Sequence, residues 1–162
     1  MLKQIIDIEI QRLLESKQVG IIYHYTNLSS LLNILKDFKL KDKLYNRNYI
    51  SFSRNGNGIK GQGSAFARIV LNGNKMSNKY SIIPYSQAMS NGKLAPYKSH
   101  KKKQAEERIY KTEVFIKPYI LAIEIIKDYA NDDMTKEEKQ KVEKLIYPKP
   151  LNIVDKWSKF KQ

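Results

Sequence analysis

Short runs of β-branched and aromatic residues, separated by glycine, asparagine and proline, constrain this fold most. Five such runs have the length and composition of strands: residues 21–25, 49–53, 65–71, 79–83 and 120–126. Asn72, Gly73 and Asn74 have the composition of a hairpin turn, and Pro84 is expected to end the strand before it. Strands joined by turns of this kind pair antiparallel, so the sequence predicts a mainly antiparallel sheet.

Three amphipathic helices flank these runs. Apolar residues at helical spacing predict a helix over 2–17 and a second helix after Thr26 or Asn27, either of which can cap it. The apolar stripe of the second helix continues to Phe38 and into residues 39–41. Thr135 opens a capping box for a third helix that ends near Ile146. We therefore expect one α+β domain over 1–162, with an N-terminal helix at 2–17, a core at about 20–126, and a C-terminal helix and tail at 135–162.

The composition removes several classes of site. The chain has 162 residues, no cysteine and two histidines, His24 and His100. These counts exclude disulfides, a thiol nucleophile, cysteine-ligated zinc or iron–sulfur sites, and a multi-histidine metal site. No apolar run has the roughly 20 residues of a membrane span, and charges interrupt the N-terminal helix where a signal peptide would be apolar. We expect a soluble, cytoplasmic monomer without a metal.

The charge of the chain favours an anionic partner. Lys and Arg total 30 against 16 Asp and Glu, which gives a formal net charge of +14. Such a surface attracts DNA, RNA or acidic proteins. Only five of the 30 are arginine, however, and a lysine-rich surface can equally be a solvated one. The basic run that we expect to meet a target closes a long loop at 86–103 and contains Lys98, Lys101, Lys102 and Lys103.

Three short motifs contain side chains that can take part in binding or catalysis. The first is Tyr23-His24-Tyr25-Thr26, at the end of a strand and just before a helix. The second is Ser51 and Ser53 with Arg54, which lead into a glycine-rich loop at 54–63. The third is Gln104, Glu106 and Glu107, after the basic loop. No Walker loop, dinucleotide fingerprint or nucleophile elbow is present.

Taken singly, each motif has an ordinary structural interpretation. A histidine at a strand end is most often a hydrogen-bonded structural group. The two serines can be the solvent face of an edge strand, and the glutamates can be surface charges compensated by the nearby lysines. The order of the motifs along the chain is more informative than any one of them.

In this order the motifs resemble the ADP-ribosyltransferase family. Tyr23-His24-Tyr25-Thr26 resembles the first-strand motif of its His-type members and of its DNA-targeting toxins. Residues 50–54 resemble the Ser-x-Ser/Thr motif of the Arg–Ser–Glu class, and residues 104–106 its Gln/Glu-x-Glu motif. The chain is also similar to small phage-encoded proteins that have a His-Tyr-Thr start and a Glu-Glu-Arg-Ile segment. The set is a hybrid of classes. The tyrosine that sandwiches nicotinamide in the His–Tyr–Glu class has no clear counterpart, and Tyr80 and Tyr85 are no more than candidates for it.

The resemblance implies an ADP-ribosyltransferase-like fold that takes NAD⁺ as substrate, and it implies roles for individual residues. Glu106 would oppose the positive charge that develops when the nicotinamide–ribose bond breaks, and Gln104 would touch the acceptor. Glu107 competes with Glu106 for the catalytic role, because a one-residue change of register exchanges the two faces of a strand. The NAD⁺-binding set would be Tyr23, His24, Tyr25, Thr26, Ser51, Ser53 and Arg54, and the acceptor-binding set Lys98, Lys101, Lys102 and Lys103.

The leading hypothesis is an NAD⁺-dependent mono-ADP-ribosyltransferase. Its acceptor would be DNA, RNA or a nucleic-acid-associated protein, in phage counter-defence or host takeover. Two alternatives stay open: a non-catalytic nucleic-acid-binding module on the same fold, and an NAD⁺ glycohydrolase that uses water as acceptor.

Overall fold

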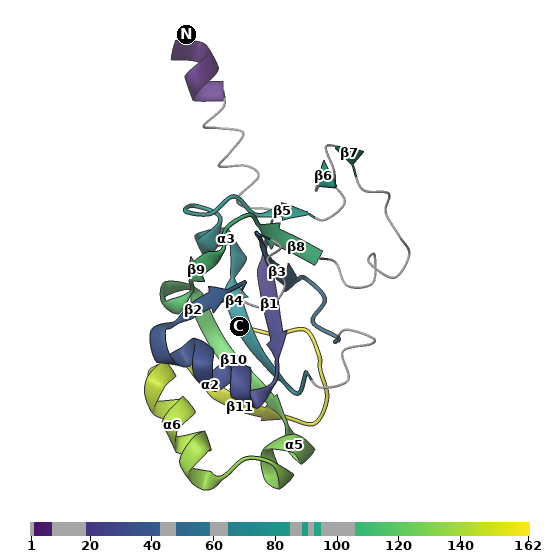
Figure 1. The fold of residues 1–162 in the computed structure, drawn as a ribbon, viewed down its shortest axis with the longest axis vertical. Helices are drawn as coiled ribbons and strands as arrows, with labels where there is room; N and C mark the ends of the chain where they lie inside the picture. The colour runs from purple at the N-terminus through teal and green to yellow at the C-terminus, as the bar shows by residue number, and fades with distance from the viewer. Residues whose placement is uncertain are drawn as a thin grey trace.

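The computed structural model describes residues 2–7, 19–42, 48–58, 65–84, 89–90, 93–94 and 106–162. A central sheet organises this part of the chain (Figure 1). Among the described residues it has seven strands: β1 (Ile21–Thr26), β3 (Ile50–Ser53), β4 (Ala67–Asn72), β5 (Ile83–Pro84), β8 (Glu106–Ile109), β10 (Ile120–Ile126) and β11 (Leu151–Val154). Their order in space is β11-β10-β4-β1-β3-β8-β5, and β1 therefore lies in the middle.

The pairing is mainly antiparallel, as the sequence predicts. Within the sheet, only the edge pair of β10 and β11 is parallel in the described part of the chain. Two small antiparallel pairs stand apart from the sheet: β2 (Lys39–Lys41) with β9 (Glu113–Phe115), and β6 (Met89–Ser90) with β7 (Lys93–Leu94). The predicted α+β class is confirmed.

Two helices cover one face of the sheet. They are α2 (Leu28–Asp37) and α6 (Lys136–Ile146), which lie next to each other in Figure 1. Their buried residues join the main core with the inward residues of β1 and β4. Asn27 caps α2 by accepting a hydrogen bond from the Ser30 amide at 2.8 Å, and Thr135 forms the predicted capping box of α6.

The opposite face is covered by extended chain. Tyr23, Val70 and Ala122 form a second, smaller core there, and Phe160 packs against it. Phe160 belongs to residues 155–162, which follow β11 and which we call the strap. The sheet therefore separates a helix side from a strap side. The shorter helical elements are α3 (Gly73–Met76), η2 (Lys117–Tyr119) and α5 (Lys127–Asp132).

Three local predictions were wrong, and one strand was not anticipated. Residues 72–74 form no hairpin turn: β4 pairs with β1 and β10, and Asn72 instead caps α3 by accepting the Lys75 amide at 3.0 Å. The strand expected at 79–83 is reduced to β5, which includes Pro84, and Tyr80 is buried in the core. Residues 39–41 form β2 rather than helix, because Phe38 ends α2 in the left-handed conformation at φ 55°. The tail contains a strand, β11, that the sequence analysis did not anticipate.

Several predictions fall on residues outside the described ranges. Of the helix expected at 2–17, residues 2–7 are helical and exposed, and 8–17 lie outside. Also outside are Tyr85, Gln104, residues 59–63 of the glycine-rich loop, and the predicted acceptor-binding lysines Lys98, Lys101, Lys102 and Lys103. No helix in the described ranges has the length and apolar character needed to cross a membrane. Those ranges also hold no group of three or more potential metal-ligating side chains.

Candidate active site

A cleft lies on the helix side of the sheet, where β1 ends. Its volume is about 620 Å³, within the range of ligand sites. His24 and Thr26 of β1, residues of α2 and β2, and Ile50 and Ser51 of β3 line it. His24 and Thr26 are two residues apart on a strand, so both side chains point to this side. The polar side chains at its α2 wall include Ser30 and Asn33.

His24 is held in one tautomer by the neighbouring strand. Its Nδ1 lies 3.2 Å from the carbonyl oxygen of Ser51, and its ring meets the ring of Phe52 edge-on at 6.0 Å. A carbonyl can only accept, so Nδ1 carries the proton and Nε2 is left as an acceptor. Burial lowers the pKa of His24, and the hydrogen bond to Ser51 opposes that effect. The imidazole is therefore neutral at pH 7 and can accept a ligand hydroxyl.

The strand register decides which glutamate shares a face with His24. Tyr23 is paired with Ser53, and Ser53 with Glu106. Directly opposite residues point to the same side, so Glu106 lies on the strap side. The next row pairs Phe52 with Glu107, on the side of the His24 ring. Glu107, not Glu106, therefore lies on the helix side, two strand spacings or about 10 Å from His24.

Glu107 is a buried carboxyl that pairs with Arg54 in the described part of the chain. Its side chain is 3% exposed, and its Oε1 lies 2.6 Å from Nε of Arg54, which is 44% exposed. Burial raises the pKa of Glu107 from 4.5 to about 6, against the opposing effect of the Arg54 charge. A carboxyl that titrates near neutral pH is suited to stabilising positive charge and to accepting a proton.

Glu106 accepts hydrogen bonds from two side chains on the strap side. Its Oε1 accepts hydrogen bonds from the Ser51 hydroxyl and from Nε of Arg108, each at 2.9 Å. The Arg108 guanidinium in turn lies 4.0 Å from the centre of the Tyr49 ring. Ser53 is buried on the same side, where its hydroxyl accepts the Asn55 amide at 3.0 Å. The structure thus brings Ser51 and Glu106 into contact on the strap side, and it places His24 and Glu107 two strands apart on the helix side.

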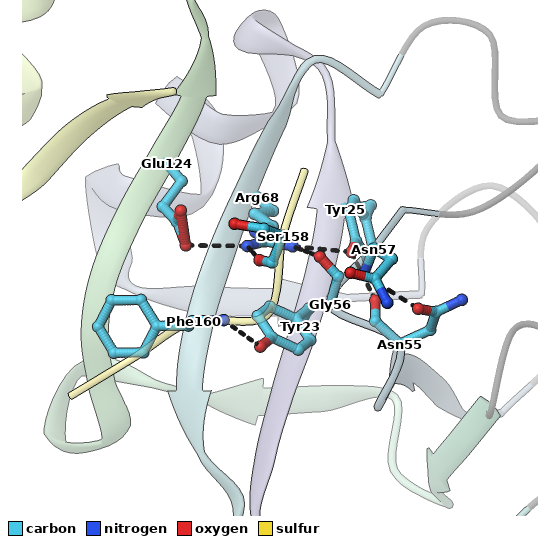
Figure 2. Close-up of polar contacts among 9 residues, drawn as sticks. All are labelled: Tyr23, Tyr25, Asn55, Gly56, Asn57, Arg68, Glu124, Ser158 and Phe160. Carbon is cyan, nitrogen blue, oxygen red and sulfur yellow. Dashed lines mark hydrogen bonds and ion pairs between the residues drawn. The ribbon is translucent and has the colours of Figure 1, made fainter. Parts of the chain in front are cut away.

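Three tyrosines that the sequence suggested as NAD⁺ contacts do not line this cleft. Tyr23 and Tyr25 point to the strap side, where Figure 2 shows them around Arg68. The Tyr23 hydroxyl accepts the Phe160 amide at 2.9 Å, and the Tyr25 hydroxyl donates to the Asn55 carbonyl at 2.6 Å. Tyr80 packs against Tyr119 in the core.

Sequence reasoning missed Arg68 and Glu124. Both are buried, and they form an ion pair at 3.1 Å across β4 and β10. A signal was present: each is a single charge inside an otherwise apolar strand. Charges are rarely buried unless they are paired, so two such strands predict that the charges meet.

No protein-family model matches the sequence, and no curated protein matches it. Solved structures do match. Thermus sp. 2.9 DarT in complex with carba-NAD⁺ superimposes with a TM-score of 0.55 at 15% identity, over 85% of this chain and 97% of that chain. The chain has the fold of DarT. A second structure, of Thermus sp. 2.9 DarT in complex with NAD⁺, gives a TM-score of 0.53 at 16% identity, over 85% and 96% of the two chains. The likeness to DarT confirms the predicted ADP-ribosyltransferase-like fold.

Proposed function

We propose that the chain is an NAD⁺-dependent ADP-ribosyltransferase that binds NAD⁺ in the cleft beside His24. One observation carries the proposal: His24, the cleft and Glu107 share the helix side of a sheet whose fold holds NAD⁺ in DarT. The cleft volume suits a ligand of nucleotide size. Glu107 lies on β8, on the same side of the sheet and beyond β3, so a dinucleotide that binds at β1 must extend past β3 to reach it.

The residues divide between binding and chemistry. His24 Nε2 accepts a ribose hydroxyl, and Thr26, Ser30 and Asn33 offer further polar contacts along the cleft. Glu107 faces the ribose carbon bonded to nicotinamide. The Arg54 charge favours the ionised form of Glu107, against the larger effect of burial. Arg54 belongs to the predicted NAD⁺-binding set, and we expect its guanidinium to lie near a phosphate, whose geometry it matches.

The reaction breaks one bond and forms one. The C1′–N bond of NAD⁺ breaks, nicotinamide leaves with the electron pair, and the ribose carries an oxocarbenium-like positive charge. The Glu107 carboxylate stabilises that charge. An acceptor oxygen or nitrogen then bonds to C1′ and loses its proton to the carboxylate or to water. With water as the acceptor, the same site would be a glycohydrolase.

The test compares two adjacent glutamates. Glu107→Gln removes the charge but keeps the shape, and it should lower nicotinamide release by a factor of about 10² or more while NAD⁺ affinity changes little. Glu106→Gln is the matched control, because it makes the same chemical change on the other face of β8. If Glu106→Gln is the inactive variant and Glu107→Gln is active, the catalytic role belongs to Glu106.

Binding is measured separately from turnover. Isothermal titration with NAD⁺ should show binding to the wild-type chain and weaker binding to His24→Ala. If no binding is seen at millimolar NAD⁺, the enzyme hypothesis is wrong and the hypothesis of a nucleic-acid-binding module remains. Nicotinamide release without any modified acceptor would identify a glycohydrolase.

The acceptor that the net charge of +14 favours is a nucleic acid or a protein bound to one. The residues that would meet it are Lys98, Lys101, Lys102 and Lys103, and the similarity to phage-encoded proteins suggests counter-defence or host takeover as the setting. Binding through N phosphates should give a slope of log K against log salt of about −0.7N on single strands. Neutralising residues 101–103 together should flatten that slope and spare NAD⁺ hydrolysis. An unchanged slope would remove these lysines from the acceptor site.

A further inference from the structure

Arg68 joins two segments that lie about 100 residues apart in the chain. The guanidinium is fully buried, and both of its terminal nitrogens make two bonds (Figure 2). Nη1 donates to the Gly56 carbonyl at 2.6 Å and to the Tyr25 hydroxyl at 3.0 Å. Nη2 donates to the Ser158 carbonyl at 2.5 Å and to Glu124 at 3.1 Å. One cation therefore binds a backbone carbonyl of the loop at 54–58 and a backbone carbonyl of the strap.

Aromatic rings enclose the same cation. The guanidinium carbon lies 4.3 Å from the centre of the Tyr23 ring, on the sheet, and 4.7 Å from that of Trp157, on the strap. The Tyr23 hydroxyl also accepts the Phe160 amide. The strap thus closes over Arg68, and its removal would expose this cation to water.

The loop at 54–58 is tethered through its first three residues. At its start, Arg54 pairs with Glu107 on the helix side. Asn55 is held by Ser53 and Tyr25, and Gly56 is held by Arg68. The loop therefore links the proposed catalytic carboxylate to the network beneath the strap.

The close approach of the strap leaves no room for a side chain at two positions of the loop, and both are glycine. A Cβ at Gly56 would lie 2.7 Å from Cα of Lys159 and 2.8 Å from the Tyr23 hydroxyl. Gly58 has φ +97°, and a Cβ there would lie 3.0 Å from the Trp157 ring. The sequence predicted a close-approach loop, and the partner that approaches it in the structure is the strap.

We infer that the strap is a positioning element for the proposed active site: through Arg68 and Trp157 it fixes the loop at 54–58 and so holds Arg54 against Glu107. This inference rests on the proposed function for its catalytic consequence. A strap that only covered apolar residues would need neither the hydrogen bonds from Arg68 to the Gly56 and Ser158 carbonyls nor glycine at positions 56 and 58.

The first test measures the coupling without NAD⁺. Tyr23→Phe removes the hydroxyl that accepts the Phe160 amide, and amide hydrogen exchange of residues 54–58 should accelerate roughly fivefold, as for the loss of one hydrogen bond. Tyr80→Phe is the matched control: its hydroxyl also accepts a backbone amide, that of Phe115, but in the main core. It should leave exchange of the loop unchanged. Equal effects of the two variants, or no effect of Tyr23→Phe on the loop, would overturn the inference.

The second test perturbs the loop and measures the strap. Gly56→Ala places a Cβ against Lys159 and Tyr23, so exchange of the Phe160 amide should accelerate while that of α6 stays as in the wild type. Coupling between two segments is reciprocal, so a strap that does not respond contradicts the inference.

The catalytic consequence is tested with the full chain. Trp157→Ala should lower the kcat of nicotinamide release several-fold with KM within about twofold, because the cleft at His24 is untouched. Trp157→Phe keeps a ring over Arg68 and should restore kcat. A faster-exchanging loop with unchanged kcat would refute the positioning role. If the wild-type chain itself releases no nicotinamide, the proposed function fails, and the exchange experiments alone decide whether the strap holds the loop.

Discussion

Replacing Glu107 with glutamine should make the protein more stable at neutral pH. Folding raises the pKa of this carboxyl from 4.5 to about 6, chiefly through burial. The folded state therefore holds the Glu107 proton more tightly than the unfolded state does. Stability consequently falls as the pH rises from about 4.5 to about 6, and the loss persists above that range. A difference of about 1.5 pKa units corresponds to about 2 kcal/mol. Glutamine has no charge to desolvate and escapes this cost.

Urea unfolding at a series of pH values measures the effect. Circular dichroism follows the sheet and helices, and the fluorescence of Trp157 follows the strap. Between pH 4 and 7 the free energy of unfolding of the wild-type chain should decline relative to that of Glu107→Gln. At pH 7.5 the variant should be more stable than the wild type by up to about 2 kcal/mol. Glu106→Gln is the control, because it leaves Glu107 in place and should keep the decline.

Two results would refute this reasoning. If Glu107→Gln shows the same decline as the wild type, another group titrates in this range. If it is less stable than the wild type at pH 7.5, the 2.6 Å ion pair with Arg54 outweighs the cost of burial. The predicted outcome, a more stable but inactive variant, is typical of a residue kept for function at the expense of stability.

Three further changes test the packing. Arg68→Met should cost about 3–5 kcal/mol of unfolding free energy in urea because it leaves the Glu124 carboxylate buried and unpaired, and the added change Glu124→Leu should recover part of it. Thr135→Ala should cost about 1 kcal/mol by removing the capping box of α6, measured as a lower urea midpoint with an unchanged slope. Gly73→Ala should cost about 1–3 kcal/mol, since its Cβ would lie 2.4 Å from the backbone oxygen of Gly20, and thermal unfolding should show it as a lower Tm.

Elements with strong local signals could be predicted from the sequence. The β-branched run at 120–126 is β10, and Asn27 and Thr135 cap the two helices that cover the sheet. Each signal lies within a few residues of the element that it defines: a cap, a periodic apolar stripe or a breaker. The order of these elements was enough to indicate the fold class.

Long-range pairing could not be predicted in this way. Residues 72–74 have turn composition, but β4 is flanked by β1 and β10 in the sheet, so its end leads to α3. Whether Glu106 or Glu107 faces His24 depends on the register between β3 and β8, which are more than 50 residues apart. Side chains alternate between the two faces along one strand, and this alternation alone does not say which of the two glutamates faces the side of His24. The strap escaped prediction because its contacts are with Arg68, Tyr23 and Gly56, all far away in the chain.

The strand order has a consequence for the folding rate. In the described sheet, no two paired strands are joined by a tight turn. Every pairing must close a long loop before it gains any contact, and such non-local topologies fold slowly, typically in milliseconds to seconds. Because the strap binds Arg68 and packs against the second core, we expect it to dock after β1, β4 and β10 have paired. The single tryptophan, Trp157, should therefore acquire its native fluorescence in the last kinetic phase of refolding.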